Sequence, residues 1–122
     1  MSTTSAVLIF RGRLGSDPQL HTTKTGEPVA NFNLAIDQGY GERKTTAWVR
    51  VSVFGKQAEA AAQHLSKGDL VSVQSDFFRV AAWTSQDNSP QGQLEVTARR
   101  VDFILTKRGQ AADVGGEEEA PF

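Results

Sequence analysis

The sequence predicts an all-β fold, a barrel of five strands with one short helix, and three observations carry this prediction. Short runs of β-forming residues, several of them alternating between apolar and polar side chains, occupy most of the 122 residues. A single stretch, residues 56–65, has the alanine-rich spacing of a helix and is followed by a glycine stop. Clusters of glycine, proline, asparagine and serine separate the runs, as expected of turns.

The first half of the chain contains three predicted strands. Residues 6–10 form a short apolar run, and we expect this strand to bend near Gly12, because glycine within a strand pattern often marks a bulge. A polar segment follows, with turn residues at 25–28 that predict a hairpin. Residues 29–36 then carry apolar side chains at every second position, which indicates a half-buried strand.

The third strand, residues 45–56, is the stretch around which the rest of the chain is organised. Its two faces differ in chemistry, because successive side chains of a strand point to opposite sides. One face carries three valines and is expected in the core, whereas the other carries Trp48, Arg50, Ser52 and Phe54. Two aromatic rings with a guanidinium between them are typical of a surface that stacks bases and pairs phosphates. A strand buried on both faces is the alternative explanation.

The second half of the chain contains the helix and two further strands. The β pattern resumes at residues 70–75 and 77–84, and a turn-rich loop leads to the last strand, residues 94–105. An irregularity is expected in that strand at Arg99 and Arg100, where the alternation is interrupted. A lone helix between the third and fourth of five strands indicates a Greek-key barrel of the OB type, which commonly binds oligonucleotides or oligosaccharides.

Composition and motifs exclude several classes of function. Because the chain has no cysteine, secretory leader or long apolar segment, we expect a cytoplasmic protein without disulfides. No phosphate-binding glycine loop or nucleophile elbow is present, and His21 and His64 are isolated, so we expect no enzyme, metal or cofactor. Residues 11–108 carry 13 basic and ten acidic side chains, a net charge of +3, whereas four acids follow in residues 109–122. This asymmetry suits a polyanion-binding body with an acidic tail.

Two further groups of cations accompany the predicted strands. The loop after the second strand carries Tyr40, Arg43 and Lys44, which would suit a stacking ring beside two phosphate partners. An ordinary hairpin connection explains this loop equally well. Arg11 and Arg13 share one face of the first strand, where they either contact phosphates or are simply solvated.

Six short motifs occur in order along the chain, at residues 12–18, 29–32, 48–51, 54–56, 65–68 and 79–84. Together they resemble the bacterial single-stranded DNA-binding proteins (SSB), and the resemblance extends from about residue 7 to residue 103. In that family the positions matching Trp48, Phe54 and Trp83 are aromatic residues that stack on bases. The resemblance therefore selects the same face of the third strand as the alternation does. Asp76 stands where the family usually has glycine.

The end of the chain carries a second resemblance. It is similar to the acidic tip with which the family docks on replication, recombination and repair proteins, and consists here of Glu117, Glu118, Glu119, Ala120, Pro121 and Phe122. A terminal phenylalanine can fill an apolar pocket while its carboxylate and the preceding acids meet basic residues. The sequence thus predicts an OB-fold domain over residues 1–108 and a disordered linker with a protein-interaction tip over residues 109–122.

The resemblance implies a non-catalytic function, the sequence-independent binding and protection of single-stranded DNA in replication, recombination and repair. It also implies a homotetramer located in the cytoplasm with the nucleoid, without membrane contact. Stacking on bases is expected from Trp48, Phe54, Trp83 and Tyr40. Phosphate contacts are expected from Arg11, Arg13, Arg43, Lys44, Arg50, Lys56 and Arg79. A primosomal-type OB-fold adaptor and an OB-fold module for a ligand other than nucleic acid remain as alternatives.

Overall fold

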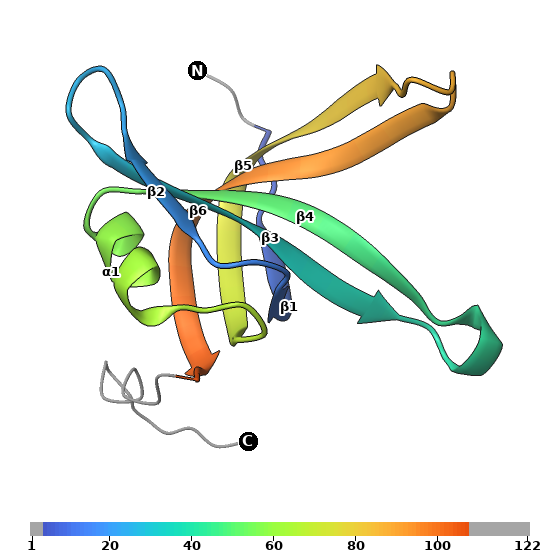
Figure 1. The fold of residues 1–122 in the computed structure, drawn as a ribbon, viewed down its shortest axis with the longest axis horizontal. Coiled ribbons are helices and arrows are strands. Elements are labelled where there is room, and N and C mark those ends of the chain that lie inside the picture. The colour runs from blue at the N-terminus through green and yellow to red at the C-terminus, as the bar shows by residue number, and fades with distance from the viewer. Residues whose placement is uncertain (1–3, 108–122) are drawn as a thin grey trace.

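A computed structural model describes residues 4–107, and strands predominate in it (Figure 1). The strands are β1 (Leu8–Leu14), β2 (Gln19–Thr22), β3 (Pro28–Gln38), β4 (Thr45–Phe54), β5 (Leu70–Thr84) and β6 (Pro90–Leu105). A 3-10 turn, η1 (Gly41–Arg43), lies between β3 and β4, and helix α1 (Lys56–His64) lies between β4 and β5. No helix of this part of the chain is long and apolar enough to span a membrane. The predicted disordered tail and tip lie outside the described residues.

Five of these strands close into a barrel. Their order is β1-β5-β6-β4-β3, and a short pairing of β1 with β3 at Arg13 and Leu14 completes the ring. The pairing of β4 with β6 is parallel, whereas the other pairings are antiparallel. β2 pairs with β3 at one edge, through the hairpin expected at residues 25–28. The predicted five-stranded OB-type barrel, with its helix between the third and fourth barrel strands, is therefore confirmed.

Alternation along β3 and β4 builds the core of the barrel. The three inward valines of β4 are at most 3% exposed, and Phe32 and Leu34 of β3 belong to the same buried cluster. α1 packs against β2, β3 and β4 through the fully buried Ala58 and Ala61. The small alanine side chains let the helix lie close to the strands, as its narrow apolar stripe predicts.

Gly12 marks the place where the barrel closes. The register of β1 against β5 is unbroken from Leu8 to Arg13, so no bulge interrupts the strand at this glycine. The glycine instead meets a close approach, because a Cβ at this position would lie 2.5 Å from the carbonyl oxygen of Ala35 on β3. The predicted special role of Gly12 therefore has a different cause, the contact between β1 and β3.

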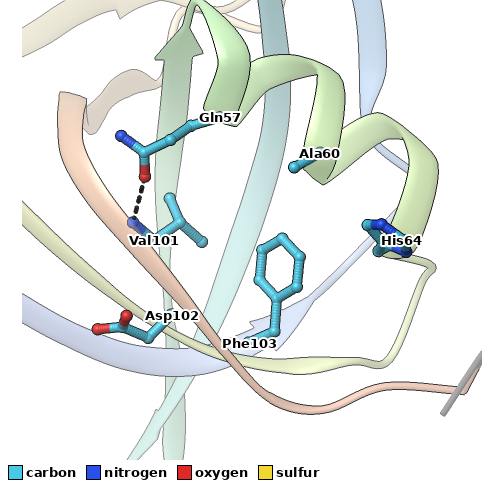
Figure 2. A pocket seen from close by; sticks show the side chains of 6 residues that line it. All are labelled: Gln57, Ala60, His64, Val101, Asp102 and Phe103. Atoms are coloured by element: carbon cyan, nitrogen blue, oxygen red, sulfur yellow. Dashed lines mark hydrogen bonds between the residues drawn. The ribbon is translucent and has the colours of Figure 1, made fainter. Parts of the chain in front are cut away.

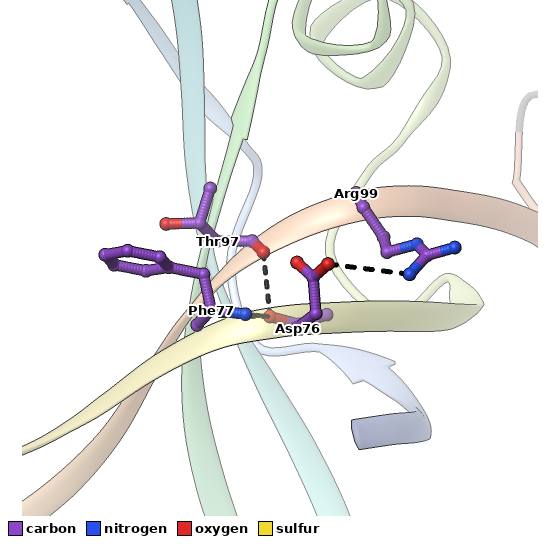
Figure 3. Close-up of polar contacts among 5 residues, drawn as sticks. Asp76, Phe77, Thr97 and Arg99 are labelled. Carbon is purple, nitrogen blue, oxygen red and sulfur yellow. Dashed lines mark hydrogen bonds and ion pairs between the residues drawn. The ribbon is translucent and has the colours of Figure 1, made fainter. Parts of the chain in front are cut away.

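The long hairpin of β5 and β6 is interrupted by a bulge. The register shifts around Ser75 and leaves Asp76 and Arg99 outside the ladder, which confirms the irregularity expected near Arg99 and Arg100. The Asp76 carboxylate pairs with the Arg99 guanidinium at 3.5 Å (Figure 3). The Ser75 hydroxyl is fully buried and lies 2.8 Å from the carbonyl oxygens of both Phe77 and Thr97. Asp76 on β5 and Arg99 on β6 are thus both left unpaired in the ladder, close to each other across the hairpin.

Beyond this bulge β5 no longer pairs with β1, and the β5–β6 hairpin extends from the barrel as a ribbon, which we call the arm and which comprises residues 77–84 and 90–97 (Figure 1). At the root of the arm, residues 94–97 of β6 still pair with β4. The turn at its tip is stabilised by Asp87, which accepts hydrogen bonds from the Ser85 and Ser89 hydroxyls and from the Ser89 backbone N–H. These hydrogen bonds favour the ionised carboxylate and lower the pKa of Asp87 to about 2.

Candidate nucleic-acid interface

The outer face of β4 presents the side chains that the alternation predicts. Trp48 is 49% exposed and Phe54 is 40% exposed, and Arg50 between them is also exposed. The valines at the intervening positions are buried, so the interpretation of β4 as a strand buried on both faces is wrong. β4 therefore presents two half-exposed aromatic rings with a cation between them.

Strand register extends this face across the sheet. In β6, Glu95 lies opposite Arg50 of β4, and in β5, Arg79 lies opposite Glu95. Residues directly opposite one another in neighbouring strands project to the same side of a sheet. The three charged side chains thus form one row across β4, β6 and β5.

Alternation along the arm adds the second tryptophan to the same side. Trp83 lies four residues from Arg79 on β5, an even spacing, so both side chains project to the side that carries Trp48 and Phe54. Trp83 is 49% exposed. We call this surface the aromatic face and define it by Trp48, Arg50 and Phe54 on β4, Glu95 on β6, and Phe77, Arg79 and Trp83 on β5.

Trp48 rests on a glycine from another part of the barrel. A Cβ at Gly15 would overlap Cζ3 of the Trp48 ring and would lie 2.9 Å from Cη2. The Gly15 backbone N–H donates a 2.8 Å hydrogen bond to the carbonyl oxygen of Asn33, which fixes the glycine beside β3. The glycine-containing motif at residues 12–18 thereby supplies the floor beneath the indole ring.

Polar side chains connect the strands beside the rings. The Ser52 hydroxyl donates a 2.7 Å hydrogen bond to Asn31 Oδ1, and Asn31 Nδ2 lies 2.6 Å from His21 Nε2. Arg79 Nε donates to Glu95 Oε1 at 2.9 Å, and the Arg79 side chain is 70% exposed. The aromatic face therefore combines apolar rings, hydrogen-bonding groups and cations, one of which is already paired with a carboxylate.

The predicted cations fall into three groups. Arg50 and Arg79 lie on the aromatic face, and Lys56 begins α1 two residues after Phe54. Arg13 Nη1 donates a 2.9 Å hydrogen bond to the carbonyl oxygen of Gly68, which holds it over the loop after α1. The cross-strand neighbour of Arg11 is Ser72, on the barrel side of the β5 bulge.

The third group occupies the loop between β3 and β4, far from the arm (Figure 1). Tyr40 is 91% exposed at the start of η1, and Arg43 and Lys44 follow it with exposed side chains. A ligand would need to extend to the end of the β3–β4 hairpin to contact these three side chains and the aromatic face together.

A pocket of about 300 Å³ lies between α1 and β6 (Figure 2). The Gln57 side chain spans its rim, donating to the carbonyl oxygen of Arg99 and accepting from the Val101 backbone N–H, both at 3.0 Å. His64 and Phe103 line it, with ring centroids 6.3 Å apart. None of the site residues predicted from the sequence lines this pocket, and residues 4–107 contain no cluster of metal-ligating side chains.

Two members of the aromatic face, Phe77 and Glu95, are absent from the sequence prediction. Glu95 can be assigned to this face only from its pairing with Arg50 and Arg79, and no local sequence pattern contains that cross-strand register. Phe77 shares its parity with Arg79 and Trp83, and that even spacing is a signal that could have identified it. The predicted tip residues, 117–122, lie outside the described part of the chain.

Comparisons with known proteins agree with this geometry. The family model for the single-strand binding protein family matches residues 5–104. Among solved structures, the chain is similar to one described as a Plasmodium falciparum SSB complex with ssDNA. That match has a TM-score of 0.67 and 23% sequence identity, and covers 85% of this chain and 99% of the other. At this identity the structural likeness supports the barrel fold alone. Because the family match covers most of the chain and includes the whole aromatic face, this chain belongs to the single-strand binding protein family.

Proposed function

We propose that the chain binds single-stranded DNA on the aromatic face, without preference for sequence and without catalysis. Single-stranded DNA is the ligand of the family to which the chain belongs. One observation carries the proposed binding mode, namely that Trp48, Phe54 and Trp83 are each 40–49% exposed on one side of a continuous sheet. Rings presented in this way offer their faces to unpaired bases.

Stacking explains why sequence would not matter. Each base stacked on an aromatic side chain contributes roughly 1–3 kcal/mol, and every base has a π-face. Duplex DNA should bind weakly, because its bases remain stacked on one another and cannot lie on the protein's rings. Tyr40 would add a further stacking site for a strand that reaches the β3–β4 loop.

Phosphate contacts would supply the remaining affinity. Arg50, Arg79 and Lys56 are the best supported cations, because they lie on or beside the aromatic face. Arg43 and Lys44 would act with Tyr40, while Arg11 and Arg13 would require the strand to continue around the barrel. Each neutralised phosphate steepens the fall of affinity with salt by about 0.7 on a log–log plot.

The wider cellular role is inferred from the sequence. We propose protection of single-stranded DNA in replication, recombination and repair, in the cytoplasm with the nucleoid, by a DNA-binding domain of residues 1–108. Residues 109–122 would serve as linker and partner-binding tip. Exposed apolar side chains on β1 and just before it, Ile9 at 65% and Val7 at 60%, support self-association, and we propose a homotetramer. Light scattering on the full chain tests this assembly.

Tryptophan fluorescence during titration with oligo(dT) tests the proposed function. We expect strong quenching by the single strand, weaker binding at high salt and little quenching by a matched duplex. Trp48→Ala and Trp83→Ala should each lower the affinity, and the oligonucleotide should remain intact throughout. Absence of quenching, together with absence of binding by filter retention at low salt, would overturn the proposal.

A further inference from the structure

Two consecutive phenylalanines at the root of the arm project to opposite sides. Phe77 is 68% exposed and lies opposite Thr97, whereas Phe78 is 44% exposed and lies opposite Val96. Val96 is only 3% exposed, so Phe78 is on the side of the sheet that faces the barrel core. Phe77 is on the outer side, which carries Arg79 and Trp83.

The bulge at Asp76 is the reason that Phe77 projects outward. Ser75 is fully buried, and uninterrupted alternation would place residue 77 on the same inner side as Ser75. The extra residue, Asp76, reverses this parity, as bulges do when they redirect a side chain. Ser75 then secures the new direction, because its hydroxyl accepts from the Phe77 N–H at 3.1 Å and lies 2.8 Å from the Phe77 carbonyl oxygen.

Phe77 completes a four-cornered arrangement of rings. On β4, Trp48 and Phe54 lie on either side of Arg50, and on β5, Phe77 and Trp83 lie on either side of Arg79. β4 runs parallel to β6 and β5 runs antiparallel to it, so β4 and β5 run in opposite directions, separated by one strand. Strand geometry places the two pairs about 10 Å apart across the sheet and the rings of each pair about 20 Å apart along it.

The surroundings of Phe77 favour a nucleic acid over an apolar protein surface. Its neighbours in the same row are the hydroxyl side chains of Thr97 on β6 and Ser52 on β4, and Arg79 lies two residues along β5. Phe77 also lines a shallow pocket with Phe78, Asp76 and residues 4–6, of which Thr4 and Ser5 carry hydroxyls. A ring beside hydroxyls and a guanidinium matches a base and its phosphate, whereas the centre of a protein interface is usually more uniformly apolar.

We infer that Phe77 is a further base-stacking residue, which extends the path of the single strand from β4 to the root of the arm. This inference rests on the proposed function and adds a contact to it. Phe78 provides a matched control, because it has the same side chain at the next position but lies on the opposite side.

A single-tryptophan reporter tests the inference directly. In a full-length chain carrying Trp48→Phe and Trp83→Phe, the only indole would be introduced by Phe77→Trp or, in the control, by Phe78→Trp. Saturating oligo(dT) should quench the Phe77→Trp reporter strongly and the Phe78→Trp reporter much less. Circular dichroism and thermal melting establish that both reporters are folded.

Affinity measurements on the otherwise native chain give an independent test. Phe77→Ala should weaken oligo(dT) binding about fivefold or more, the change that corresponds to loss of ~1 kcal/mol of stacking. Phe77→Tyr should restore the affinity, whereas Phe77→Leu, which lacks a π-face, should not. Phe78→Ala should leave the affinity close to the native value.

Two results would overturn the inference while the proposed function stands. One is an unquenched Phe77→Trp reporter when Trp48 and Trp83 of the native chain are quenched. The other is a reporter already shielded from a soluble quencher before DNA is added, in a manner that depends on protein concentration, since a second copy would then cover Phe77. Absence of quenching and binding in the native chain itself would remove the proposed function as well.

Discussion

Trp48 is positioned by the close approach of a glycine, Gly15. Gly15 lies beneath the indole ring, and any side chain there would overlap it. The Gly15 backbone does not have a positive φ, so an alanine would introduce no backbone strain. The effect of the substitution would instead come from displacement of the Trp48 ring.

We therefore predict that Gly15→Ala displaces Trp48 and lowers affinity for oligo(dT) about tenfold. Overpacking of this kind typically costs about 1–3 kcal/mol in stability, so a lowered melting temperature is also expected. Fluorescence anisotropy and thermal melting measure the two effects. Gly92→Ala is the control, because its Cβ would meet nothing closer than 3.7 Å. Native affinity in Gly15→Ala would show that the ring position is unimportant.

Glu95 places a negative charge in the middle of the aromatic face. It lies opposite both Arg50 and Arg79 and forms an ion pair with Arg79 that a phosphate would have to displace. An exposed pair of this kind contributes only about 0–1 kcal/mol to stability, so the fold does not depend on it.

We predict that Glu95→Gln strengthens binding to oligo(dT) several-fold at low salt. The amide keeps the shape of the side chain but no longer competes with phosphate for the arginines. The slope of log affinity against log salt should steepen by about 0.7 if one more phosphate is neutralised. Weaker binding by Glu95→Gln would mean instead that the carboxylate is needed to orient Arg79.

At the scale of the elements, the β5 bulge determines the shape of the arm. Local alternation predicts β3 and β4 correctly, because one face of each strand is buried and the alternation is broken only by the buried Val29 near the start of β3. The same reasoning fails at residues 75–77, because the extra residue there interrupts the alternation and residues beyond it point to the opposite side of the sheet from the one that alternation predicts. The Arg99–Arg100 irregularity was visible in sequence, but its partner Asp76 on β5 was identified only by the pairing.

Ser75→Ala should destabilise the protein by about 0.5–1.5 kcal/mol, because it removes the fully buried hydroxyl that bonds to backbone groups of Phe77 and Thr97. Urea unfolding followed by circular dichroism measures this loss. Ser72→Ala, on the barrel half of the same strand, is the control and should change stability less. Equal stability of the two variants would indicate that the bulge is held by the strand ladder alone.

At the scale of the whole molecule, charge is divided unevenly along the chain. The net charge of residues 11–108 is +3, whereas the four acids of residues 109–122 are negatively charged, as DNA is. An acidic segment tethered to a basic domain competes with DNA for the same cations, and this competition is strongest where screening is weak.

Deletion of residues 117–122 should therefore tighten oligo(dT) binding several-fold at low salt. The difference from the full chain should vanish near 1 M salt, where the Debye length falls to about 3 Å. Replacing Glu117, Glu118 and Glu119 by glutamine separates charge from the terminal Pro-Phe. Identical affinities of the deleted and full chains at every salt concentration would contradict this prediction.

The sequence by itself determined the five barrel strands and the helix in their order along the chain, the buried and exposed faces of β3 and β4, and the choice of Trp48, Arg50 and Phe54. Turn residues and alternation are local signals, and the segment from β3 to α1 follows them closely. Only the tertiary structure decided that Arg79, Trp83 and Phe77 share one face with those residues, and that Arg13 is held by the loop after α1. Cross-strand register and bulges depend on hydrogen bonds between segments far apart in the chain, which no local pattern encodes.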